Sequence, residues 1–208
     1  MGTRHLIAVY LDGDYKIAQY GQWDGCPAGQ GVKVLEFLSA EKSVDNLKLA
    51  LARVRYLDPA GKDKEFVDDY NKRAPKFYDD PETRTDRQIE WWDTYISRDL
   101  GADILTNIAN SNDNEMVLKN HIDFAGDSQS CTWAYIIDLD KGTFEIYKGF
   151  NTLPLTEDAR FYRSPRDVGS QYYPVKLLVS FELNNLPTIE DFLSLTEIDK
   201  NEEDKPHN

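Results

Sequence analysis

The chain has 208 residues, of which 40% are hydrophobic and 12% aromatic, and its formal net charge at pH 7 is −13. This length supports one substantial domain rather than two, and the apolar content is that of a globular protein. An acidic surface repels nucleic-acid backbones and anionic membranes, and the sequence has no dense run of lysine and arginine. We therefore expect the partner to be a small molecule or another protein, with no nucleic acid and no membrane involved.

The two cysteines, Cys26 and Cys131, are too few for a disulfide framework in a chain of this size. The N-terminus shows no apolar stretch followed by a cleavage site, and no apolar run is long enough to span a bilayer. We therefore expect a cytoplasmic protein with reduced thiols. The three histidines are scattered along the chain, whereas a zinc site needs clustered ligands, so we expect no metal and no cofactor.

Two β-hairpins are predicted, one towards each end of the chain. The first is centred on Asp12-Gly13, a dipeptide typical of tight hairpin turns between two runs of β-forming residues. The second is joined by residues 139–142. We expect strands at residues 4–10, 15–20, 131–138, 143–148 and 175–183.

Between the hairpins, apolar residues recur at helical spacing. We expect helices at residues 32–38, 44–56, 88–96, 97–109 and, near the end of the chain, 186–193. Strand groups that flank a helical block indicate an α+β fold with two antiparallel hairpins or sheets, and an αββα sandwich is its most specific form. Residues 1–198 are expected to form one domain with an exposed excursion at 58–88, followed by an acidic, disordered tail at 199–208.

The most distinctive stretch is residues 19–31, here called the glycine-rich loop, which holds four glycines and one proline between a predicted strand and a predicted helix. Such a composition predicts a shaped loop. The loop is either a long connection with Trp23 plugging the core, or a rigid polar wall that presents side chains to a ligand. In the second interpretation the ligand-binding residues are Gln22, Trp23, Asp24 and Gln30.

Two further acids are candidate ligand-binding residues. Asp99 precedes a predicted helix, where capping of the helix N-terminus would also explain it. Asp127 lies in a second loop of small residues at 124–130, where an Asx turn would also explain it. Paired acids can carry out general acid–base chemistry, but nothing in the sequence places these two together.

Several motifs are distinctive in combination. They are Met1-Gly-Thr-Arg4, the Asp12-Gly13 turn, residues 15–31, Ser97-Arg-Asp-x-Gly101, residues 133–140 and Tyr147-Lys-Gly-Phe150. These motifs, which span most of the chain up to about Phe161, resemble a family of uncharacterised proteins found in fungi, bacteria and phages. The resemblance implies no activity. Cys26 stands where the family pattern leads us to expect tyrosine, which argues against a cysteine nucleophile.

The N-terminal region is also distantly similar to N-terminal-nucleophile hydrolases, in which a Gly-Thr junction opens a strand and a hairpin turn follows. This similarity implies Thr3 as the nucleophile after loss of Met1 and Gly2, with its own α-amine as the base. Lys33 would tune that amine. The acid expected in the return strand is missing, because Gln19 and Tyr20 stand there.

Two hypotheses for function follow. The first is a ligand- or protein-binding domain that uses the glycine-rich loop, which requires Trp23 and Asp24 to be accessible. The alternative is an amide-bond hydrolase of the N-terminal-nucleophile kind, which requires a free Thr3 amine facing a pocket near Lys33.

Overall fold

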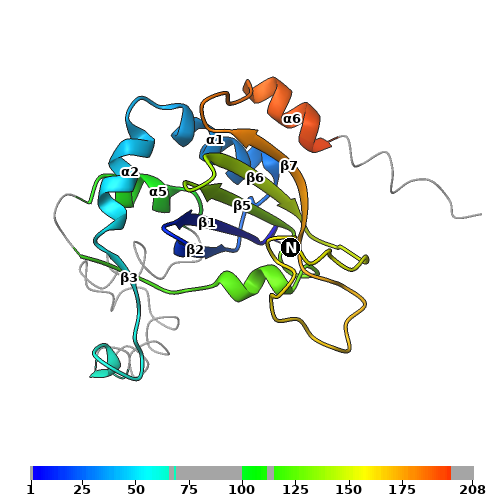
Figure 1. Cartoon of the computed structure of the whole chain (residues 1–208), viewed down its shortest axis with the longest axis horizontal. Coiled ribbons are helices and arrows are strands. Elements are labelled where there is room, and N and C mark those ends of the chain that lie inside the picture. Colours follow the sequence, from blue (N-terminus) through cyan, green and yellow to red (C-terminus); the bar gives the residue numbers. More distant parts are fainter. Residues whose placement is uncertain (1, 66–67, 69–99, 112–114, 198–208) are drawn as a thin grey trace, which may run out of the picture.

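The computed structural model describes residues 2–65, 68, 100–111 and 115–197 (Figure 1). The predictions for residues 88–96 and for the tail at 199–208 lie outside the described residues, as do the first three residues of the helix predicted at 97–109. The α+β class is confirmed, because helices pack on a mixed sheet of five strands.

Both predicted hairpins form, and they lie in the same sheet. The strands are β1 (His5–Leu11), β2 (Asp14–Gly21), β5 (Trp133–Asp138), β6 (Thr143–Lys148) and β7 (Lys176–Glu182), in the order β2-β1-β5-β6-β7. Neighbouring strands are antiparallel except for β1 and β5, which pair in parallel with His5 opposite Trp133. This parallel pairing joins the two hairpins edge to edge, whereas an αββα sandwich would stack them face to face.

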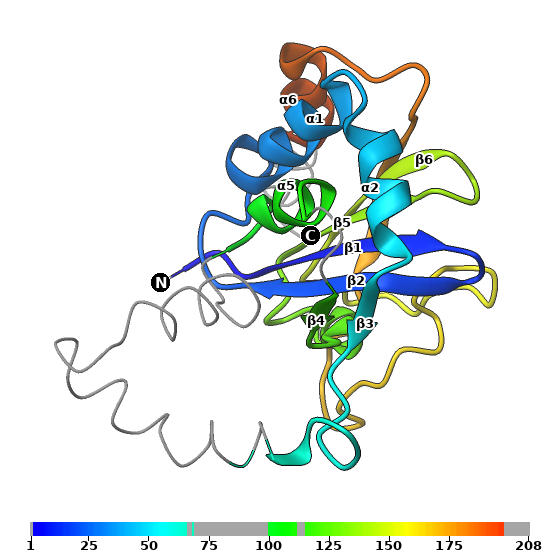
Figure 2. The same cartoon turned by 90° about the vertical axis from the view of Figure 1, so that its left-hand side faces the viewer.

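The helices lie on one face of the sheet (Figures 1 and 2). They are α1 (Val32–Ser39), α2 (Ser43–Leu51), α5 (Asp103–Ala109) and α6 (Ile189–Glu197). The helix predicted at 44–56 ends at Leu51, because β3 (Val54–Tyr56) pairs in parallel with β4 (Met116–Leu118). The β-branched Val54 and the aromatic Tyr56 favour a strand there.

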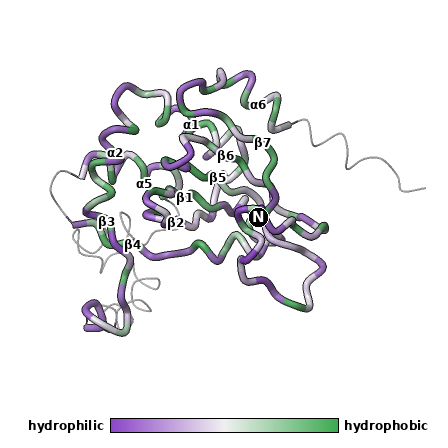
Figure 3. The backbone as a smooth tube through the Cα atoms, viewed as in Figure 1, coloured by the Kyte–Doolittle hydropathy of each residue, from purple (hydrophilic) through white to green (hydrophobic). Residues whose placement is uncertain are grey.

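The central strands β1, β5 and β6 are buried on both faces of the sheet, whereas the edge strand β7 is partly exposed. Ile7 and Val9 of β1 point into the core beneath the helices, while Leu6 and Ala8 point into a second core on the opposite face. Period-two alternation in a strand with two covered faces produces such a continuous apolar run. Accordingly, the strands of the sheet include many of the most hydrophobic stretches of the backbone tube in Figure 3.

The second core is covered without a helix layer. The short helical turn η4 (Ile122–Gly126) and the irregular segment 149–175 lie over it, with Ala125, Phe161 and Val175 buried. The glycine-rich loop and residues 126–132 lie at the end of the sheet where β1 and β5 begin. None of the described helices is long and apolar enough to cross a membrane.

Candidate functional site

The glycine-rich loop is fixed from its inner side. The buried Tyr135 hydroxyl donates to the Gly25 carbonyl at 2.8 Å, and the Gly25 N–H donates to the Thr3 carbonyl at 2.9 Å. The prediction of a loop over the whole of residues 19–31 is wrong at both ends, because the stretch begins within β2 and ends in a helical turn, η1 (Pro27–Gly31). The Gln30 N–H donates to the Asp24 carbonyl at 2.8 Å, which joins this turn to the irregular part of the stretch. Because these bonds are made by backbone groups and a fully buried phenol, the loop conformation is held independently of its outward side chains.

Two glycines let the loop approach the start of β1 closely. A Cβ on Gly25 would lie 2.6 Å from the Thr3 carbonyl oxygen and 2.7 Å from the His5 Cβ, and a Cβ on Gly21 would overlap the His5 ring. Asp24 adopts a left-handed backbone with φ of 54°, a conformation that aspartate tolerates better than most residues. These positions explain why the stretch is rich in glycine.

Trp23 and Asp24 project from the outer side of this loop. The Trp23 side chain is 47% exposed and Asp24 is exposed, so the interpretation of Trp23 as a core plug is wrong. Gly2 packs beneath the indole, since a Cβ there would lie 2.5 Å from a Trp23 ring carbon. Gln22 is half-buried, and its side-chain oxygen accepts the Tyr20 hydroxyl at 2.6 Å.

His5 lies under the loop and was not identified as a site residue from the sequence. It is 1% exposed, and neither ring nitrogen has a hydrogen-bond partner among the described residues. Burial lowers the pKa of His5 from 6.5 to about 4; the Thr3 backbone and the Asp24 charge oppose this shift, and the Lys33 charge adds to it. The imidazole is therefore neutral at physiological pH.

Gln30, predicted to bind ligand, instead stabilises the interior. It is buried, and its side-chain oxygen accepts the Ala102 N–H at 2.8 Å. Gly101, with a left-handed φ of 53°, leaves room for the Gln30 amide, which a Cβ at that position would overlap. The prediction fails because the buried Ala102 N–H needs an acceptor, and Gln30 provides it.

Of the other two predicted acids, only Asp127 belongs to the described residues, and it lies in a turn before β5. Asp127 is exposed and its carboxylate accepts the Ser130 N–H at 3.1 Å, which is the Asx turn anticipated as an alternative. It lines a hollow of about 260 Å³ together with Asp167 and Tyr172. Asp99 lies outside the described residues.

Both residues of the hydrolase hypothesis, Thr3 and Lys33, act on the pKa of His5 beneath the glycine-rich loop. Thr3 is half-buried and its carbonyl holds Gly25, while Gly2 is packed under Trp23. Lys33 is exposed, and within the described residues no hydrogen bond joins it to Thr3. The hypothesis requires removal of Met1 and Gly2, which would free the Thr3 amine and take away the residue packed under Trp23.

The two cysteines offer no catalytic pair. Cys131 is fully buried, and burial raises the pKa of its thiol well above the usual range, which keeps it protonated. Cys26 is half-buried and is not disulfide-bonded. Among the described residues, no group of three or more histidine, cysteine or acidic side chains is arranged to hold a metal ion.

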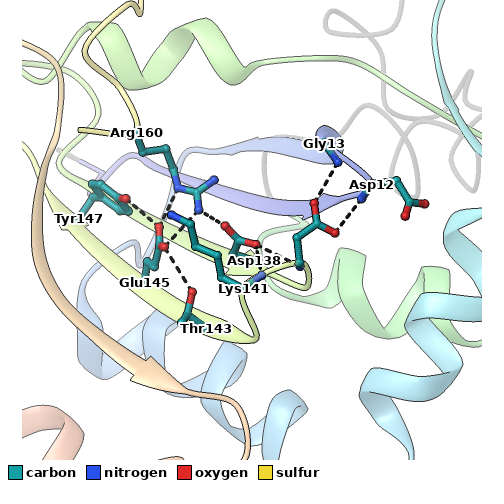
Figure 4. A network of polar contacts seen from close by, with 9 residues as sticks. Asp12, Gly13, Asp138, Lys141, Thr143, Glu145, Tyr147 and Arg160 are labelled. Atoms are coloured by element: carbon teal, nitrogen blue, oxygen red, sulfur yellow. Dashed lines mark hydrogen bonds and ion pairs between the residues drawn. The ribbon is translucent and has the colours of Figure 1, made fainter. Parts of the chain in front are cut away.

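A buried ionic network lies on the sheet face opposite the helices (Figure 4). The Arg160 guanidinium contacts the carboxylates of Asp138 and Glu145, and the Tyr147 hydroxyl donates to Glu145 at 2.7 Å. Burial disfavours the Arg160 charge, but hydrogen bonds to Glu145, Tyr15 and Asp138 outweigh that cost and raise its pKa. The network ties segment 149–175 to β5 and β6.

This network was not predicted from the sequence, although β6 carries part of the pattern. Thr143, Glu145 and Tyr147 are polar or amphipathic at period two within an otherwise apolar strand, which places them on one face. Arg160 follows in a segment without periodicity, and no local pattern connects it to Glu145.

Comparisons with protein-family models, with curated proteins and with solved structures find no match to this chain.

Proposed function

We propose that the chain is a binding protein, with Trp23 and Asp24 at the centre of its ligand surface. One observation supports this most directly: the loop is fixed internally through Gly25 and Gln30, yet it leaves a large aromatic side chain half-exposed beside an exposed carboxylate. A preorganised surface loses less conformational entropy when it binds.

The chemistry of the two side chains suggests the class of group that is bound. Tryptophan is frequent among the residues that dominate binding energy in interfaces. An indole face attracts cations, and the neighbouring Asp24 carboxylate adds direct charge attraction. The proposed ligand, a small molecule or an exposed part of a protein, therefore carries a guanidinium or ammonium group.

The proposal can be tested with Nα-acetyl-arginine ethyl ester, a cation, and its neutral isostere, Nα-acetyl-citrulline ethyl ester. The readout is the indole N–H resonance of Trp23 in a nitrogen–proton correlation spectrum, assigned with Trp23→Phe. We expect a saturable shift with the arginine ester, and a much smaller response to the citrulline ester.

The chain provides a matched control for the charge. Asp12 is also exposed and also left-handed, with φ of 53°, but it lies in the β1–β2 turn. We expect Asp24→Asn to weaken binding about fivefold, on the scale of one exposed charge contact, and Asp12→Asn to leave it unchanged. Equal responses to the two esters, or equal weakening by the two variants, would rule out the proposed surface.

A further inference from the structure

Two adjoining hollows lie beside β6 and β7, away from the glycine-rich loop. One has a volume of about 430 Å³ and the other about 240 Å³, and both are lined by Leu153, Lys176 and Leu177. We call the pair the β6–β7 groove. The larger hollow is within the size range of small-molecule sites.

The groove has a buried apolar base and two exposed apolar side chains at its border. Tyr147, Phe161 and Val175 line the larger hollow and are almost fully buried, whereas Leu153 is 61% and Leu177 48% exposed. Single exposed hydrophobic side chains are normal on a protein surface. Here, however, two of them border the same concave site, which is typical of ligand-binding surfaces.

Some charged groups of the groove already have a partner within the described part of the protein, and others do not. Glu145 is occupied by Arg160, Tyr147 and Thr143. Lys141 and Lys176 are exposed, and neither forms an ion pair with any described residue.

One exposed acid also lines the groove. Hydrogen bonds from Thr156 and from its own backbone lower the pKa of Asp158, so its carboxylate is charged at neutral pH and opposes one of the two ammonium charges. In a chain with a net charge of −13, the groove still offers two ammonium groups outside any ion pair of the described residues, against one exposed carboxylate, beside apolar side chains.

We infer that the β6–β7 groove binds a small amphiphilic carboxylate, with its apolar body against Leu153 and Leu177 and its anionic head near Lys141 and Lys176. This site is distinct from the surface proposed around Trp23, which favours a cation. The opposite charge preferences of the two surfaces make their tests independent.

The test uses octanoate and the neutral 1-octanol as probes, measured by isothermal titration calorimetry on the full chain. We expect octanoate to bind with a stoichiometry of one and 1-octanol to bind at least fivefold more weakly. Lys176→Gln and Lys141→Gln should each weaken octanoate binding about fivefold, the scale of one exposed charge contact. Leu177→Ser should weaken both probes.

Matched controls come from α2, where Lys48 is exposed and Leu49 is 71% exposed. Lys48→Gln and Leu49→Ser should leave octanoate binding unchanged, as should Trp23→Phe. Apart from Trp23, the substituted residues lie outside the glycine-rich loop. An unchanged thermal unfolding midpoint verifies the fold of each variant. The inference is overturned if octanoate does not saturate at millimolar concentration, if 1-octanol binds equally well, or if the α2 variants weaken binding as much as the groove variants.

Discussion

The hydroxyl of Tyr135, which is completely buried in β5, donates a hydrogen bond of 2.8 Å to the carbonyl of Gly25 in the glycine-rich loop. The bond links the centre of the sheet to a loop more than one hundred residues earlier in the chain. It fixes the backbone immediately after Trp23 and Asp24, so the conformation of the proposed binding surface depends on a residue of the core.

Tyr135→Phe removes this bond and leaves the buried Gly25 carbonyl without its donor. We expect a loss of about 1–3 kcal/mol in the free energy of unfolding, the range found for an unsatisfied buried polar group. We also expect greater fast motion of the Trp23 indole, measured by nitrogen-15 relaxation of its assigned N–H resonance. Tyr162→Phe, at a tyrosine that is 43% exposed, is the control and should change neither quantity. An unchanged stability in Tyr135→Phe would show that the bond does not hold the loop.

Gly25→Ala tests the close approach of the loop to β1. The added Cβ would lie 2.6 Å from the Thr3 carbonyl oxygen, so backbone must move. We expect a destabilisation of about 1–3 kcal/mol, as for overpacking of a core, in urea denaturation. Gly169→Ala is the matched control, because the nearest atom to its added Cβ is a side-chain oxygen at 3.5 Å. Equal stability of the two variants would contradict the packing described for Gly25.

The buried His5 makes stability depend on pH. Its pKa is 6.5 in an unfolded chain and about 4 in the folded chain, so between these values the unfolded chain binds more protons than the folded chain. The free energy of unfolding should therefore be highest above pH 6.5 and fall by roughly 3 kcal/mol as the pH drops to about 4.

Urea denaturation at a series of pH values measures this effect. His5→Leu should remove most of the decline, because leucine occupies the apolar site without titrating. His121→Asn should retain most of it, although burial lowers the pKa of His121 as well. If His5→Leu and the unmodified chain lose the same stability on acidification, the neutral state of His5 is not responsible.

Arg160→Met tests the ionic network. The substitution leaves Asp138 and Glu145, which are 0% and 5% exposed, without their cation. Breaking a buried pair in this way costs about 3–5 kcal/mol. Arg55→Met is the comparison, because Arg55 pairs with Asp63 and Glu115 nearer the surface and should cost at most about 1 kcal/mol. If chemical denaturation gives at most about 1 kcal/mol for Arg160→Met as well, the network contributes no more than a surface ion pair does.

Local signals predicted the elements of the fold well. The Asp12-Gly13 turn identified the first hairpin, the connection at residues 139–142 identified the second, and an apolar run identified β7. The pairing of β1 with β5 could not be predicted, since it depends on contacts between residues such as His5 and Trp133 that share no local pattern. The expectation of two stacked sheets came from the same missing information.

The candidate site was predicted only in part, again because long-range contacts have no local pattern. Glycine content located the loop, and the exposure of Trp23 and Asp24 agrees with the interpretation as a presenting loop. The inward position of Gln30 depends on the Ala102 N–H, and the importance of His5 depends on the approach of Gly21 and Gly25. Neither partner is recognisable before the chain has folded.

The parallel pairing of β1 with β5 also has a consequence during synthesis on the ribosome. The β1–β2 hairpin can close early, but the other edge of β1 stays unpaired until residues 133–138 have emerged. The hydrogen bond from the Thr132 hydroxyl to the Arg4 carbonyl spans 128 residues of sequence. At translation rates of about 5–20 residues per second, the nascent hairpin would wait on the order of ten seconds with an apolar strand edge open. During this interval the chain is exposed to chaperones and to association with other nascent chains.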